Sequence, residues 1–197
     1  STYVKSNELK KGQEINVDNI DNNIVISTSP IVKETTRTIT INNNFMIGKR
    51  YVTALYRRGI DSINLNYEGE QTLKAVKKLM DKDTIGYEII KQTNNSITIK
   101  DFSVKSTNEF NNIIRRMWLI LLENSKELIK TVESKEFQSL NMIIARDKDI
   151  NKFSNYCCRL VFKGSLNSFE ESVIMYNFLR NLENISDSYK EISKYLL

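Results

Sequence analysis

Two acidic residues near the end of the chain are spaced so that they could share a cation. Glu183 and Asp187 are four residues apart in an amphipathic stretch, so on a helix both carboxylates project from one face. Asp147 and Asn151 have the same spacing in the preceding amphipathic stretch, where they continue its apolar stripe. Hard divalent cations prefer oxygen ligands such as carboxylates. We therefore expect Asp147, Glu183 and Asp187 to form a weak site for manganese, iron or magnesium, in which the neutral Asn151 contributes less than an acid would.

A simpler interpretation of the same acids needs no metal. A carboxylate on a partly apolar face requires a partner, because burying a lone charge is costly. Asp147 could pair with Arg115, Arg146 or Arg159, or lie exposed at the edge of its stripe. Glu183 and Asp187 could simply repel each other and stay solvated.

Catalytic chemistry has little support in this sequence. The chain has no histidine, which removes the commonest general base and the commonest zinc ligand. The two cysteines, Cys157 and Cys158, are adjacent, so we expect them to pack as small apolar residues in a reducing cytoplasm. No glycine-rich phosphate loop or nucleophile motif occurs. Trp118, Phe153 and Tyr156 could suggest a ligand site, but at helical spacing we expect core packing, and the protein is not expected to be an enzyme.

The bulk properties leave several partners open. The chain has 197 residues and a formal net charge of +5, which permits a nucleic-acid or anionic-membrane partner without demanding one. The apolar run at 117–122 is too short to cross a bilayer, so no membrane insertion is expected. Lys49, Arg50, Thr53 and Arg57 share one face of an expected helix. That face could bind phosphate groups or could be an ordinary solvated side.

The hydrophobic pattern predicts an α+β chain with three parts. Residues 1–32 contain two short strands, 13–18 and 23–28, in which Ile15, Val17, Ile24 and Ile26 form an apolar face that needs cover. Residues 35–104 alternate strands and helices and form a small α/β region. In it, the helix at 45–58 should bury Tyr51, Val52 and Leu55 and end at Gly59.

Residues 106–197 predict an antiparallel three-helix bundle. Capping boxes open the first and third helices at Ser106 and Ser168, and Ser134 could cap the second, which Gly164 ends. The first helix should bury an apolar stripe that ends at Val132, and the third a stripe that begins at Val173.

The N-terminal part resembles an AbrB-type swapped-hairpin DNA-binding domain. The resemblance rests on residues 7–17, with the core Leu9-Lys-Lys-Gly-Gln-Glu14, followed by the strand at 23–27. Only Ser1–Ser6 precede the matched stretch at 7–17, so most of the half of the motif that contacts DNA is absent or compressed; a strand and helix upstream of Ser1 would complete it. The resemblance implies a homodimer joined through residues 9–28, with Lys10 and Lys11 as candidate DNA contacts.

The rest of the chain is similar to the PhoU family of helical regulators of phosphate uptake, in the form that archaeal proteins combine with an AbrB-like head. Residues 51–63, 151–160 and 178–187 carry this likeness, and in that family the acids of the last segment hold metal ions. The resemblance implies a regulator of phosphate uptake or transcription. The alternative is an adaptor that does not bind DNA and docks on a phosphate transporter or kinase.

Overall fold

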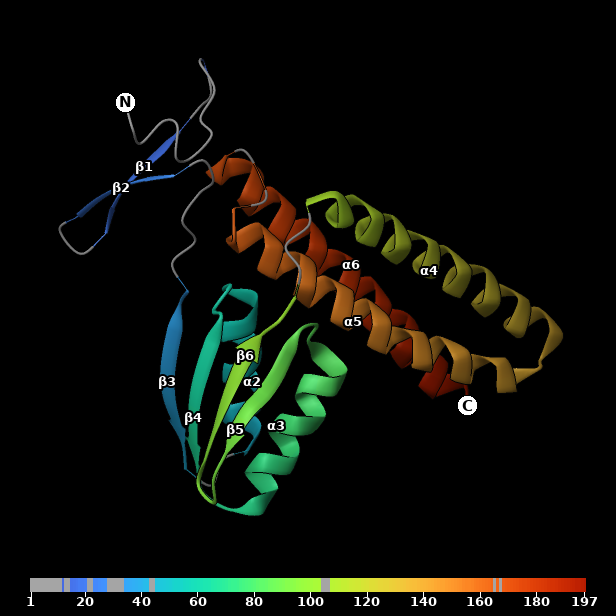
Figure 1. Cartoon of the computed structure of the whole chain (residues 1–197). Helices are drawn as coiled ribbons and strands as arrows, with labels where there is room; N and C mark the ends of the chain where they lie inside the picture. Colours follow the sequence, from blue (N-terminus) through green and yellow to red (C-terminus); the bar gives the residue numbers. More distant parts are fainter. Residues whose placement is uncertain are drawn as a thin grey trace. The chain divides into compact units, whose positions relative to one another are not determined.

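The computed structural model describes residues 12, 15–20, 23–27, 34–42, 45–103, 107–164, 166 and 168–197. The chain divides into two compact units, Ser1–Glu34 and Thr35–Leu197. The described residues combine a sheet of mixed parallel and antiparallel strands with a run of helices toward the C-terminal end, which confirms the α+β class (Figure 1).

The first unit contains an antiparallel hairpin of β1 (Asn16–Ile20) and β2 (Asn23–Ser27). The register places Val17 opposite Ile26, so the predicted apolar side chains share one face. Pairing continues to Ile20 opposite Asn23, so the first strand runs two residues past its predicted end at residue 18. Ile15, Val17 and Ile24 are 47%, 63% and 73% exposed.

The second unit begins with a mixed sheet in the strand order β3-β4-β6-β5. Strand β3 (Thr36–Ile41) is parallel to β4 (Ser62–Tyr67), whereas β6 (Ser96–Asp101) is antiparallel to both β4 and β5 (Tyr87–Gln92). A parallel pair needs a crossover, and helix α2 (Phe45–Arg57) supplies it between β3 and β4.

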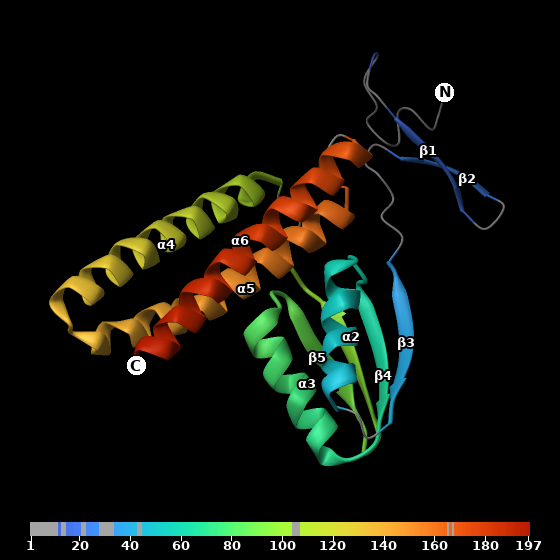
Figure 2. The same ribbon diagram turned by 180° about the vertical axis from the view of Figure 1, so that it is seen from behind.

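Helices α2 and α3 (Glu70–Asp83) cover the same face of this sheet (Figure 2). The strands alternate accordingly, and their buried side chains include Ile39, Ile41, Ile63, Leu65, Tyr67, Tyr87, Ile97 and Ile99. Helix α2 buries Val52 and Leu55 as predicted, but Tyr51 is 50% exposed and the predicted burial of Tyr51 was wrong. Tyr56 is fully buried instead, because the core-facing row runs through 52, 55 and 56.

The end of α2 follows the glycine prediction. Gly59 has φ +79°, and its N–H donates to the Tyr56 carbonyl at 3.0 Å. The N–H of Ile60 donates to the Leu55 carbonyl at 3.2 Å. These two bonds define a Schellman motif, which requires the left-handed conformation that glycine adopts at no steric cost.

The C-terminal region consists of long helices: α4 (Thr107–Ser134), α5 (Leu140–Phe162) and α6 (Phe169–Leu196). Ser168 caps α6 by accepting a hydrogen bond from the Glu171 N–H at 3.1 Å, as predicted. The predicted cap at Ser134 was wrong, since Ser134 is the last residue of α4. A 3₁₀ turn, η1 (Phe137–Ser139), precedes α5. Ser106 lies outside the described residues.

Helix α5 joins the helical region to the α/β part. It packs against α4 and α6 and also against α2 and α3 (Figures 1 and 2). The stretch Ser154–Val161 is buried all round, which is typical of a helix enclosed by neighbours. Residues 35–104 and 106–197, which differ in type of structure, therefore form one compact unit.

The outer helices bury less than predicted. Trp118 and Val132 of α4 are 48% and 52% exposed, and Val173, Ile185 and Ile192 of α6 are also exposed. Phe153 is half-buried and Tyr156 is buried, so of the three aromatics expected in the core Trp118 was the error. In the described part of the chain, none of the helices combines the length and apolarity needed to cross a membrane.

Candidate functional site

Helices α5 and α6 bring two of the three predicted metal ligands together. Asp147 is 2% exposed, and its Oδ1 accepts a hydrogen bond from the Ser186 hydroxyl at 2.9 Å. Its Oδ2 accepts from Lys190 Nζ at 2.9 Å and from Asn151 Nδ2 at 3.0 Å. The ammonium of Lys190 also donates to Asp187, so one lysine bridges both acids.

Charge balance explains this arrangement. Burial alone would lower the pKa of Lys190, but its hydrogen bonds to Asp147 and Asp187 outweigh burial and raise that pKa. The partner of Asp147 is therefore a lysine of α6 and not one of the arginines considered from the sequence. Arg146 donates to Asn124, and Arg159 pairs elsewhere.

Glu183 is one helical turn before Asp187 and has a different partner. It is 8% exposed and lies 2.8 Å from Arg180 across an ion pair. The pair is not aligned as a hydrogen bond, since Glu183 Oε2 and Arg180 Nη1 have no hydrogen-bond partner within the described residues. Burial raises the pKa of Glu183, Arg180 and Arg57 oppose that rise, and Asp187 and Asp147 add to it.

The donor set fits a metal only after rearrangement. No group of three or more acidic, cysteine or histidine side chains in the described ranges is placed to hold an ion. The Lys190 ammonium lies between Asp147 and Asp187, where a cation shared by these acids would lie. The metal site stays a prediction, and a metal there would have to displace Lys190. The candidate DNA contacts Lys10 and Lys11 lie outside the described residues.

A buried charge cluster that the sequence did not reveal joins α5 to the end of the sheet. Arg159 is 0% exposed, and its guanidinium donates to Asp101 Oδ2 from Nη2 at 2.6 Å and from Nε at 3.2 Å. Nη1 donates to the carbonyls of Tyr56 at 2.9 Å and Ile60 at 2.7 Å. The cation also lies about 5 Å from the ring centres of Tyr56 and Tyr87, at 5.0 and 5.2 Å.

Asp61 completes this cluster at its outer side. It accepts hydrogen bonds from Lys163 of the α5 C-cap and from the Thr35 backbone and hydroxyl. Burial would raise the pKa of Asp61, but the hydrogen bonds from Lys163 and Thr35 hold it below its usual value. The charges of this cluster are partnered, and their bonds fix the helical region to the α/β part.

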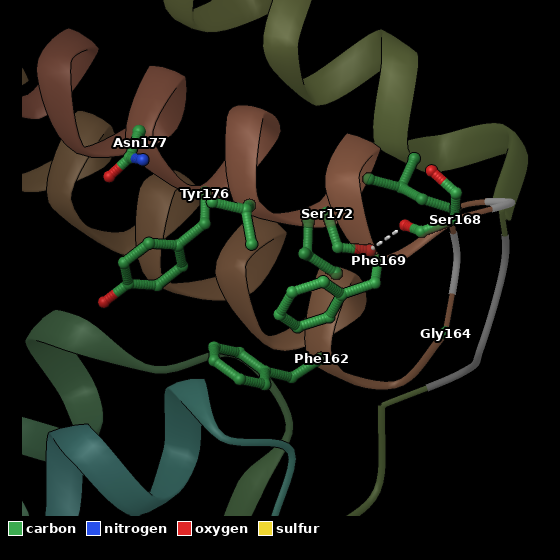
Figure 3. Close-up of a pocket in the computed structure, with 10 residues that line it drawn as sticks. Phe162, Gly164, Ser168, Phe169, Ser172, Tyr176 and Asn177 are labelled. Carbon is green, nitrogen blue, oxygen red and sulfur yellow. Dashed lines mark hydrogen bonds between the residues drawn. The ribbon is translucent and has the colours of Figure 1, made fainter.

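The turn between α5 and α6 forms a separate, apolar pocket of about 630 Å³. Figure 3 shows the rings of Phe162, Phe169 and Tyr176 around it. Phe162 and Tyr176 meet edge to face at 5.7 Å, and Phe169 is 83% exposed. The Ser172 hydroxyl donates to the Ser168 carbonyl at 2.9 Å and helps to start α6. The Ser168 and Ser172 hydroxyls are used within the first turn of α6, and apolar side chains dominate the lining, so the pocket suits an apolar side chain better than a polar ligand.

Comparison of the chain with protein-family models, with curated proteins and with solved structures found no match.

Proposed function

We propose that the protein is a cytoplasmic regulator of phosphate uptake or transcription, with a dimerising head and a helical sensing region. The observation that carries the proposal is the hairpin unit, whose Val17 and Ile24 are 63% and 73% exposed. Two short strands are only marginally stable alone, so this apolar face needs cover. A second copy of the hairpin supplies it, as exchanged hairpins do in AbrB-type heads.

In this proposal the parts act in order along the chain. The head dimerises and holds DNA through contacts that include Lys10 and Lys11. Helices α4, α5 and α6 act as a PhoU-like three-helix bundle that responds to a signal. The contacts of α5 with α2 and α3 support this role, because they couple the helices to the α/β part.

Light scattering tests the dimer. The full chain should have a dimer mass at micromolar concentration, and Val17→Asp with Ile24→Asp should convert it to a monomer. Thr38→Asp, an exposed strand residue of the other unit, is the control and should leave the dimer intact. A full chain that is monomeric under these conditions contradicts the dimerising head.

The regulatory role is tested in cells. Deleting the gene should change phosphate uptake, or the transcripts of phosphate-transporter genes, when phosphate is shifted from scarce to abundant. Restoring the wild-type gene should reverse the change. Unchanged uptake and unchanged transcripts would refute the regulatory function.

Metal sensing is tested by titration with manganese. A site at Asp147, Glu183 and Asp187 should bind weakly, because the ion competes with the Lys190 ammonium. Lys190→Met should strengthen binding, and Glu183→Gln with Asp187→Asn should abolish it. If Lys190→Met binds no better than wild type, the competing-cation argument is wrong.

The second candidate function is an adaptor that docks on a phosphate transporter or kinase without contacting DNA. It is favoured by the exposed row Trp118, Leu122, Ile129 and Val132 along α4, since such rows are typical of protein interfaces. Leu122→Glu with Ile129→Glu should abolish copurification with the transporter ATPase. Lys130→Glu, on the same helix, is the control. Retained copurification would exclude α4 as the docking face.

A further inference from the structure

A polar cleft of about 330 Å³ lies where α2, the end of α3, α5 and α6 meet. The basic face that the sequence predicted on α2 forms one wall of it. The described lining is Met46, Lys49, Arg50, Thr53, Arg57, Lys82, Asp83, Asn151, Asn155 and Glu183. The volume is within the range of small-ligand sites, which typically begin at about 300 Å³.

The cleft carries an excess of positive charge. Its lining holds four cations, Lys49, Arg50, Arg57 and Lys82, against the acids Asp83 and Glu183, so the formal balance is +2. Within the described ranges, Lys49, Arg50 and Lys82 have neither a salt bridge nor a side-chain hydrogen bond. A balance of this size matches a phosphate monoester, which carries about −1.5 to −2 at neutral pH.

One of the four cations is fixed in orientation. Arg57 donates from Nε to Asn155 Oδ1 at 2.7 Å, and Asn155 Nδ2 donates to the Asp83 carbonyl at 2.9 Å. Asn155 is 3% exposed, so this amide is a rigid support. The terminal nitrogens of Arg57 make no hydrogen bond to any described residue. A guanidinium held at Nε with both terminal nitrogens available suits bidentate binding of phosphate.

The α6 side of the cleft provides a buried acceptor. Glu183 Oε2 and the neighbouring Arg180 Nη1 are buried without a hydrogen bond to any described residue. Buried polar atoms without a hydrogen bond are rare, and among the described residues the ion-pair partner of Glu183 Oε2 is Arg180 Nη2, 2.8 Å away. A hydroxyl on the organic part of a ligand could donate to Glu183 while the phosphate group of the same ligand is bound by Arg57.

We propose that this cleft binds a small phosphate ester that also carries hydroxyl groups, such as a nucleoside or sugar phosphate. Arg57 holds the phosphate with Lys49 and Lys82, and Glu183 accepts from a hydroxyl. The proposal rests on the proposed function, to which it adds the chemical class of the signal. A phosphorylated metabolite is a natural reporter of phosphate supply.

Calorimetry on the full chain tests the site, with AMP, ribose 5-phosphate, inorganic phosphate and adenosine as probes. AMP or ribose 5-phosphate should bind at least about tenfold more tightly than inorganic phosphate, and adenosine should not bind measurably. A response to AMP alone indicates a nucleotide site, and equal responses to both esters indicate a sugar phosphate site. Either supports the proposal.

Variants locate the binding. Arg57→Gln should weaken binding by roughly tenfold or more, as expected when a charged hydrogen-bonding group is removed. The double variant Lys49→Gln with Lys82→Gln tests the same cleft if Arg57→Gln does not fold. It should leave the fold intact, since neither lysine supports another side chain among the described residues. Lys78→Gln, an exposed lysine of α3 outside the cleft, is the matched control.

Absence of binding by both esters overturns the proposal, as does binding that the lysine pair and Lys78→Gln weaken equally. The outcome is separate from that of the regulatory function. If the esters bind but gene deletion has no effect, the ligand site is supported and the regulatory function is refuted. If gene deletion has an effect but neither ester binds, the regulatory function is supported and the ligand site is refuted.

Discussion

Replacing Arg159 with methionine tests how the two parts of the Thr35–Leu197 unit are held together. Methionine fills much of the same volume but cannot donate a hydrogen bond. The change leaves Asp101, whose side chain is 5% exposed, without its charge partner. It also removes the donor that the carbonyls of Tyr56 and Ile60 share.

The expected loss is large relative to the stability of a domain. Removing one partner from a buried ion pair costs about 3–5 kcal/mol. Ordinary domains have about 5–15 kcal/mol in total, so Arg159→Met should remove about a fifth or more of the free energy of unfolding. For a unit of this size the melting temperature should fall by roughly 6–20 °C.

Urea unfolding followed by circular dichroism measures the effect. Arg58→Met, an exposed arginine on the last turn of the α2 region, is the control and should change stability by less than about 0.5 kcal/mol. Asp101→Asn should lower the free energy of unfolding less in the Arg159→Met background than in the wild type. In the wild type it leaves the buried Arg159 charge without Asp101, whereas in the Arg159→Met background that charge is already absent. If Arg159→Met is as mild as the control, or the two changes are additive, the cluster does not hold the unit together.

Three further predictions concern single positions. Burial raises the pKa of Glu183 above its ordinary 4.5, with Arg180 opposing and Asp187 reinforcing the shift, so wild-type stability should fall as pH rises through that raised pKa. Glu183→Gln cannot ionise, so its urea midpoint should rise relative to that of wild type as the pH is raised from the ordinary glutamate pKa of 4.5 through the raised one; a difference in midpoint that does not change with pH would contradict this. Burial raises the pKa of Cys157 to about 12 and of Cys158 to about 11, so both thiols should react with a disulfide reagent only as the protein unfolds, and rapid labelling of the native protein would disprove their burial. Gly86 has φ +84°, and a Cβ there would lie 2.6 Å from the Ser103 N atom, so Gly86→Ala should lower the melting temperature by several degrees; an unchanged value would refute the strain argument.

Local patterns predicted the elements well because helices and strands are set by periodicity and caps within a few residues. The Schellman turn at Gly59 and the cap at Ser168 depend only on neighbouring backbone, and both were predicted correctly. Tyr51 was wrongly placed because an apolar stripe on a short helix tolerates rotation by about one residue, and only the position of the sheet decides which row is buried.

The charge clusters depend on pairings between distant segments, which periodicity does not contain. Asp147 was correctly recognised as needing a partner, but Lys190 became that partner only through the register of α5 against α6. Arg159 is the one charged residue in the stretch Ser154–Val161, which is buried throughout. An arginine in such a stretch is the one sequence feature that could have indicated a buried ion pair, although not its partners.

The Arg159 junction also bears on the order in which the chain folds. Its bonds to Tyr56 and Ile60 connect positions 103 and 99 residues apart along the chain. Closing so long a loop is entropically costly and becomes favourable only after the sheet and helices have formed locally. Contacts made after the transition state slow unfolding without speeding folding. We therefore expect the junction to form after the transition state, so that it slows unfolding and leaves the rate of folding to the local elements.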